Sequence, residues 1–146
     1  MGVRTRSRKA LLQGRFACVL NEDDTLSDCM KGIKQSLSDP EAGIGASLDS
    51  DNWNWLLALG QTIEANIDEI DESIAAVLEN WTLERLSIVT RLILEQAVAE
   101  MNYLTPHTPV SVVIDEALEL TRVFETEETV KFVNAILDRL KNTETE

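Results

Sequence analysis

The segment from Trp81 to Leu104 constrains the fold of this chain more than any other part. Its apolar residues recur at steps of three and four, the period of a helix: Leu83, Leu86, Val89, Ile93, Ala97 and Met101. Further apolar residues lie on the other faces, and acids interrupt only at Glu95 and Glu100. A helix that is apolar nearly all round belongs in the interior of a domain. We therefore expect a central helix with the other helices packed around it.

The expected ends of this central helix follow from capping residues and prolines. Thr82 is a good N-cap and is followed by Glu84 in the first turn. Pro106 and Pro109 cannot continue a helix, so the segment must end near Leu104. This gives a helix of about twenty residues.

Two helices are expected at the amino-terminal end of the chain. The first runs from about Arg4 to Leu20, with an apolar stripe of Ala10 or Leu11, Leu12, Phe16, Val19 and Leu20. Thr25 caps the second, which ends before Asp39 and carries Leu26, Met30, Ile33 and Leu37. Residues 38–51 hold Pro40, Gly43 and Gly45 among small polar residues and are expected to form a loop. This loop is the best candidate for a boundary.

The remaining elements are also helical in pattern. A third helix starts near Asp51 and carries Trp53, Leu56, Leu57, Leu59 and Ile63, with Gly60 at a close contact. Around Asn66 it either continues or breaks before a fourth stripe. Pro109 suits the first turn of the next helix. The last helix buries Phe132 or Val133, and residues 141–146 are expected to fray. Since no strand-like alternation occurs, the predicted class is all-α.

The charge of the chain is uneven. The formal net charge is −13, yet residues 1–20 carry five basic residues and no acid, so the other 126 residues carry −18. An acidic body with a basic end can hold a phosphate backbone at that end only. The alternative interpretation of the basic end is a short frayed terminus.

Several function classes find little support in the residues. No apolar run reaches the roughly 18 residues of a membrane span, and no signal peptide is recognisable. Cys18 and Cys29 form neither a disulfide framework nor a metal site, so a reducing cytoplasm is the expected location. His107 lies in a Thr-Pro-His-Thr-Pro turn without a partner at ligand spacing. We expect no enzyme activity, no cofactor and no metal.

Three segments together resemble the NusB family of transcription antitermination factors. These are RTRSRKALLQGRF (residues 4–16), ENWTLERLSIVTRLILEQAVAEM (79–101) and PVSVVIDEALELTRVFETEETVKFVNAILDRL (109–140). The resemblance implies a single NusB-like domain of two packed helical bundles, at about 1–78 and 79–141. It also implies binding to boxA-type ribosomal RNA leaders together with NusE, a small-subunit ribosomal protein, with an indirect link to the RNA polymerase elongation complex.

The resemblance also implies which residues bind. Cations for the RNA phosphates would come from Arg4, Arg6, Arg8, Lys9 and Lys131, with Phe132 as a stacking platform and Asn134 as a base contact. On spacing alone, Phe132 is instead a core residue, and Asn134 is equally a capping residue. Phe16 and Thr90 fall at positions associated with partner binding. A homodimer is possible, since an apolar patch around Trp53 and Trp55 would support one, although core packing suits those rings better.

This chain departs from the family pattern at several positions. Glu125 and Ala135 replace glycines, Phe16 replaces a tyrosine, and Thr90 replaces an acid. Glu125 adds negative charge near the proposed RNA path. These changes support an alternative function, an acidic protein–protein interaction module that kept the fold and lost RNA binding.

Overall fold

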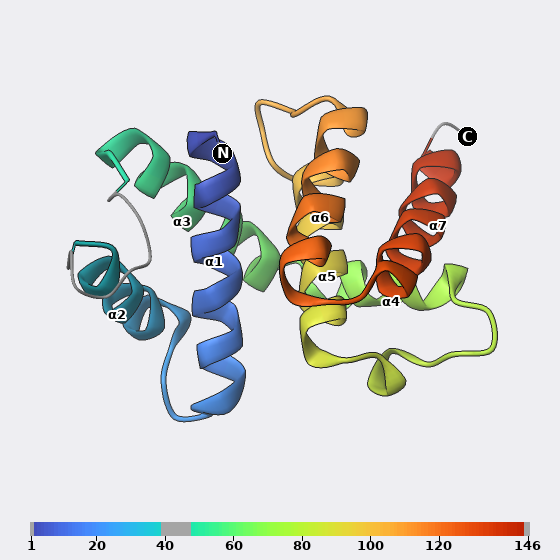
Figure 1. The fold of residues 1–146 in the computed structure, drawn as a ribbon, viewed down its shortest axis with the longest axis horizontal. Helices are drawn as coiled ribbons and strands as arrows, with labels where there is room; N and C mark the ends of the chain where they lie inside the picture. Colours follow the sequence, from blue (N-terminus) through green and yellow to red (C-terminus); the bar gives the residue numbers. More distant parts are fainter. Residues whose placement is uncertain (1, 39–47, 145–146) are drawn as a thin grey trace. The chain divides into compact units, whose positions relative to one another are not determined.

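The chain is all-α over the part that the structure describes, as the sequence predicted. The computed structural model describes residues 2–38 and 48–144, and these residues contain seven α-helices, one 3₁₀ turn and no strand (Figure 1). The chain forms two compact units, residues 1–60 and 61–146. Most of the predicted loop 38–51 lies outside the described residues. The predicted division into subdomains near residue 78 stays a prediction.

The first unit contains α1 (Val3–Leu20), α2 (Leu26–Ser38) and the first part of α3 (Ser50–Ala65). α1 packs against α2. Leu11 and Leu12 of α1 and Met30 of α2 are buried. Thr25 starts α2 as predicted, since its hydroxyl accepts a hydrogen bond from the Asp28 amide while the Asp28 carboxylate accepts one from the Thr25 amide. This reciprocal pairing is a capping box. The hydrogen bonds from Thr25 lower the pKa of Asp28.

The predicted apolar stripe of α1 is correct only in its first half. Ala10, Leu11 and Leu12 are buried, whereas Val19 is exposed and Leu20 is 64% exposed. Two arginines, Arg8 and Arg15, are buried instead. The helical period identifies which residues share a face, but it does not show where along a helix its neighbours end.

The predicted close contact at Gly60 of α3 is present. A Cβ atom at this position would lie 3.0 Å from Leu26 Cδ2 and 3.2 Å from Leu11 Cδ1. The absent side chain therefore lets α3 approach the side chains of α1 and α2 closely. The turn at Asn66 settles the alternative left open by the sequence, because α3 ends at Ala65 and a separate helix follows.

The second unit is built on α5 (Ile88–Asn102), which corresponds to the predicted central helix. Every residue from Leu92 to Met101 is buried. α5 packs against α4 (Ile67–Val77), α6 (Val110–Phe124) and α7 (Glu127–Glu144), and α6 and α4 also pack against α7. The prediction of a buried helix surrounded by others is confirmed for this unit.

The predicted start of this helix is wrong. Residues Leu83–Arg85 form the separate turn η1, Leu86 is extended, and the helix begins at Ile88. Thr82 makes no capping hydrogen bond through its side chain, whereas Ser87 Oγ accepts one from the Thr90 amide at 3.1 Å. Both residues are good N-caps by type, so only the hydrogen bond distinguishes them.

Three further predictions about α6 and α7 can be compared with the structure. Pro109, which was expected in the first turn of α6, is instead the N-cap residue directly before it. Val133, and not Phe132, is the fully buried residue of the pair. The tail is not frayed from Lys141, because α7 continues to Glu144.

Arg91 forms an ion pair that joins α5 to α4 in the second unit. The Arg91 guanidinium of α5 lies 3.0 Å from Asp71 of α4 and 3.4 Å from Glu95 of its own helix. Asp71 is half-buried, whereas the other acids of α4, Asp68, Glu69 and Glu72, are exposed. No helix among the described residues is long and apolar enough to cross a membrane.

The observed start of α5 gives a stability prediction. Replacing Ser87 by alanine removes the acceptor for the Thr90 amide, and we expect it to lower the free energy of unfolding by about 1 kcal/mol. Thr82→Ala is the matched control, because that hydroxyl caps nothing. Urea unfolding of both variants measures the difference. Equal losses at the two positions would contradict the observed start.

Candidate nucleic-acid interface

The four basic residues near the amino terminus, Arg4, Arg6, Arg8 and Lys9, form an arginine cluster on the first two turns of α1. Their exposure differs widely. Arg4 is exposed, Arg6 and Lys9 are half-buried, and Arg8 is only 5% exposed. The sequence alone gave no reason to distinguish these four cations. In the structure Arg4 is the most accessible of them to a ligand.

Trp55 of α3 lies beside this cluster. The Arg4 guanidinium carbon is 4.4 Å from the centroid of the Trp55 ring, and that of Arg8 is 5.1 Å away. These distances are within the range of a cation–π interaction. Residues four apart on a helix share a face, which explains how one ring reaches both arginines.

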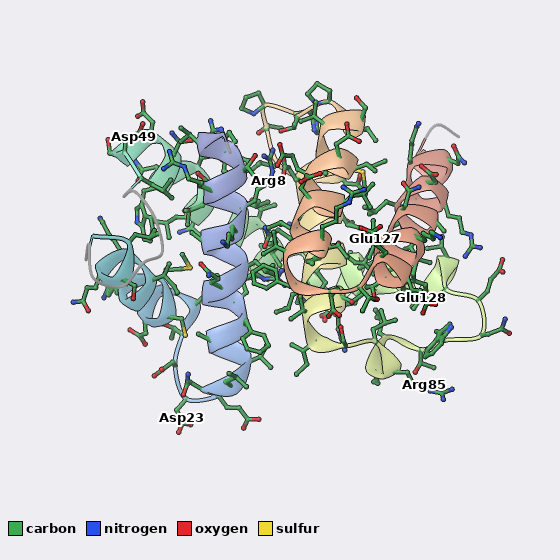
Figure 2. The ribbon with its side chains drawn as sticks, viewed as in Figure 1. Arg8, Asp23, Asp49, Arg85, Glu127 and Glu128 are labelled. Carbon is green, nitrogen blue, oxygen red and sulfur yellow. The ribbon has the colours of Figure 1, made fainter. Side chains whose placement is uncertain are left out.

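Asp49, just before α3, is the acid associated with the arginine cluster. Its carboxylate accepts a hydrogen bond from the Asn52 amide at 2.8 Å and so caps the start of α3. Figure 2 labels Asp49 at this end of the helix. This hydrogen bond, with the nearby positive charges of Arg4 and Arg6, lowers the pKa of Asp49. The carboxylate is therefore ionised at neutral pH and partly offsets the positive charge of the cluster.

Arg6 carries a further polar group of interest. Its Nε atom is buried and has no hydrogen-bond partner among the described residues. A buried guanidinium donor without an acceptor is costly.

The second group of predicted residues, Lys131, Phe132 and Asn134, forms what we term the α7 patch. Lys131 and Asn134 are exposed, and Phe132 is half-buried. Phe132 is thus neither a full core residue nor a free ring. The exposed acids Glu127 and Glu128 lie one turn earlier on α7, so the patch has an acidic border (Figure 2).

Two departures from the family pattern meet at the hydroxyl of Ser87. Ser87 donates a hydrogen bond to Glu125 Oε1 at 2.8 Å, and Thr90 Oγ1 lies 2.9 Å from the same oxygen atom of Ser87. Glu125 therefore connects the end of α6 to the start of α5, in addition to carrying charge. Thr90 is only 4% exposed, and Phe16 is half-buried. Their assignment to partner binding stays a prediction, and Thr90 would present little surface to a partner.

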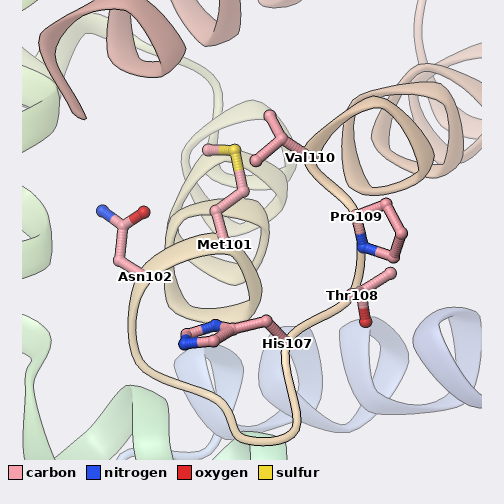
Figure 3. Close-up of a pocket in the computed structure, with 6 residues that line it drawn as sticks. All are labelled: Met101, Asn102, His107, Thr108, Pro109 and Val110. Atoms are coloured by element: carbon pink, nitrogen blue, oxygen red, sulfur yellow. The ribbon is translucent and has the colours of Figure 1, made fainter. Parts of the chain in front are cut away.

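A shallow hollow at the turn between α5 and α6 is the place to look for catalysis. It is lined by Met101, Asn102, His107, Thr108, Pro109 and Val110 (Figure 3). His107 is the one residue of this lining with an acid–base side chain, so the hollow provides no acid–base pair. Among the described residues no group of three or more His, Cys, Asp or Glu side chains is placed to hold a metal ion.

The charge of the chain divides sharply at the unit boundary. Residues 1–60 contain seven basic and eight acidic residues, whereas residues 61–146 contain six basic and eighteen acidic ones. The formal charges are thus −1 and −12. A polyanion would be repelled by most of the second unit, so the arginine cluster is the best candidate contact for phosphates.

Sequence reasoning missed Trp55 and Asp49 as parts of this site. Trp53 is a core residue, as was favoured, but Trp55 is half-buried against the arginines. The available signal was the i, i+4 spacing of Arg4 and Arg8, which places both side chains on one face of α1. Which residue of another helix provides that neighbour cannot be read from spacing.

Comparison with known proteins supplies the family. A model described as the NusB family matches residues 5–142. The transcription antitermination protein NusB of Elusimicrobium minutum is 47% identical over 73 residues, which are 50% of this chain and 52% of that protein. NusB of Treponema denticola is 46% identical over 87 residues, 60% of this chain and 62% of that protein. The chain therefore spans little more than half the length of these curated relatives.

Solved structures show the same fold. A structure of NusB from T. maritima is 33% identical, with a TM-score of 0.74 over 94% of this chain and 89% of that one. A crystal structure of antitermination factors NusB and NusE in complex with dsRNA has a TM-score of 0.82, with 22% identity and 98% of each chain covered. At that identity the second likeness establishes the fold alone.

The environment of Asp49 gives a prediction about its pKa. Replacing Arg4 and Arg6 by glutamine should raise the pKa of Asp49, because two nearby positive charges are removed. The pKa should stay below its ordinary value, since the hydrogen bond from the Asn52 amide remains. Carboxyl ¹³C chemical shifts followed over pH measure both effects. Asp28, whose pKa is lowered by Thr25, is the internal control and should not change.

Proposed function

The chain belongs to the NusB family, as its motifs predicted, and on this premise we propose that it is an RNA-binding transcription antitermination factor. Its ligand is boxA-type RNA of ribosomal leaders, which it binds together with NusE. Its connection to the RNA polymerase elongation complex is indirect and runs through these two partners. The role is one of binding without catalysis, and its place is the cytoplasm.

The arginine cluster carries this proposal. Arg4 is exposed, and Arg6 has a buried donor without an acceptor among the described residues. Guanidinium groups meet phosphate oxygens with two parallel hydrogen bonds, which suits a nucleic-acid backbone. The names of the relatives support the same function, since the curated ones are transcription antitermination proteins.

The charge distribution supports a need for NusE. With a formal charge of −12 on residues 61–146, the second unit gives RNA little electrostatic attraction. The α7 patch contributes a single cation, Lys131, beside Glu127 and Glu128. A basic partner protein would add the positive charge that this chain lacks. The solved complex of NusB, NusE and dsRNA is a precedent for such an assembly.

The test of this function is RNA binding by the pair. We expect weak binding of a labelled boxA RNA by this chain alone and tighter, sequence-selective binding when NusE is added. Fluorescence anisotropy at about 50 and 200 mM salt measures affinity and its salt dependence. A scrambled RNA of the same length is the control. No binding by the pair, with helical folding verified by circular dichroism, would instead support the interaction module that lost RNA binding.

The arginine cluster itself is tested by one substitution. Arg4→Gln should weaken RNA binding by the pair about five- to tenfold for all sequences and reduce the salt slope by about 1, as expected for one lost phosphate contact. Lys31→Gln removes an exposed positive charge from α2 of the same unit and should leave affinity nearly unchanged. Equal effects of the two variants would mean that only net charge matters.

A further inference from the structure

Trp55 is the aromatic side chain that the arginine cluster contacts. It lies on α3, at the border between the buried residues Trp53, Leu56 and Leu59 and the exposed residues Asn54 and Ala58. Its ring is within cation–π distance of two guanidiniums from successive turns of α1, those of Arg4 and Arg8. A tryptophan that only filled the core would not need two cations against its ring.

We propose that Trp55 is a positioning residue for RNA binding, which holds Arg4 in the orientation that meets a phosphate. This inference rests on the proposed function. An exposed arginine on the first turn of a helix samples many rotamers, and ordering them opposes binding. A ring that already holds the guanidinium removes part of that cost before RNA arrives.

Contact with the Trp55 ring through the flat face of the guanidinium leaves Arg4 able to bind. A guanidinium that stacks on a ring uses its flat face, while its N–H donors point outward in the plane of the group. Those in-plane donors are the ones that pair with phosphate oxygens. Arg4 can therefore contact Trp55 and a phosphate at the same time.

Arg8 has a different part in this arrangement. It is buried, so its contact with Trp55 anchors the ring rather than presenting a cation to solvent. Asp49 caps the start of α3, and the positive charges of Arg4 and Arg6 contribute to its lowered pKa, so the carboxylate and the two guanidiniums attract one another. The start of α3 thus organises the start of α1.

The experiment combines two substitutions at Trp55 with a double-mutant cycle. Trp55→Leu should weaken boxA RNA binding by the NusE pair about two- to fivefold, the size of one cation–π interaction. Trp55→Phe, which keeps an aromatic face, should restore most of the affinity. In a chain that already carries Arg4→Gln, Trp55→Leu should add almost nothing, because its effect runs through Arg4.

Trp81 supplies the matched control. It is 50% exposed, and Arg85 lies 5.4 Å from its ring, so Trp81→Leu makes the same chemical change at another arginine–tryptophan pair. RNA affinity should be unchanged in this variant. Circular dichroism and urea unfolding show whether each variant is folded.

A second measurement separates this inference from the proposed function. In the free protein, the Arg4 Nε–H signal should carry a ring-current shift that Trp55→Leu removes and Trp81→Leu leaves in place. If the wild-type pair binds no RNA, both the proposed function and the role of Trp55 in RNA binding are wrong. The NMR shift still decides whether Trp55 holds Arg4. An equal loss of affinity from Trp55→Leu with and without Arg4 would overturn the inference, because Trp55 would then touch RNA directly.

Discussion

The burial of α5 is the constraint on which the second unit depends. A helix with ten consecutive buried residues, Leu92 to Met101, is stable only when neighbours cover it on several sides. α4, α6 and α7 all pack against it, and they are amphipathic helices with one apolar face each. The buried stretch includes Glu95 and Glu100, and burying a charge is costly unless it is paired. Arg91 pairs with the Glu95 carboxylate and so offsets part of this cost. It also pairs with Asp71, which joins α5 to α4.

Charge, and not shape, limits where this chain can bind a polyanion. All seven basic residues of the first unit lie within the first 34 positions, whereas the second unit has three acids for each base. Acids also pair with cations of the second unit. Arg122 bonds Glu119 and Glu127, and Arg139 bonds Glu79 and the Val77 carbonyl. These guanidiniums serve the protein's own contacts, and the arginine cluster is therefore the proposed contact for phosphates.

The sequence predicted the helices well because periodicity and capping are local properties. The capping box at Thr25, the break before α6 and the buried face of α5 all follow from residues a few positions apart. Features that depend on residues far apart were not predictable. Ser87 is the N-cap of α5 in place of Thr82, and Glu125, 38 positions further on, bonds its hydroxyl. Arg8 is likewise buried, and Trp55 meets two arginines, for reasons that lie on another helix.

The same hydroxyl of Ser87 changes how the departures from the family pattern should be understood. Taken singly, the acid replaced by Thr90 and the glycine replaced by Glu125 are one lost charge and one gained charge. In the structure both residues meet Ser87 at the start of α5, where a carboxylate is favoured by the helix dipole and by the free amides of the first turn. Glu125 therefore has a structural part at this corner, because its carboxylate accepts the hydrogen bond of Ser87, the N-cap residue of α5. The hydrogen bond ties the end of α6 to the start of α5, whatever the negative charge does near the proposed RNA path.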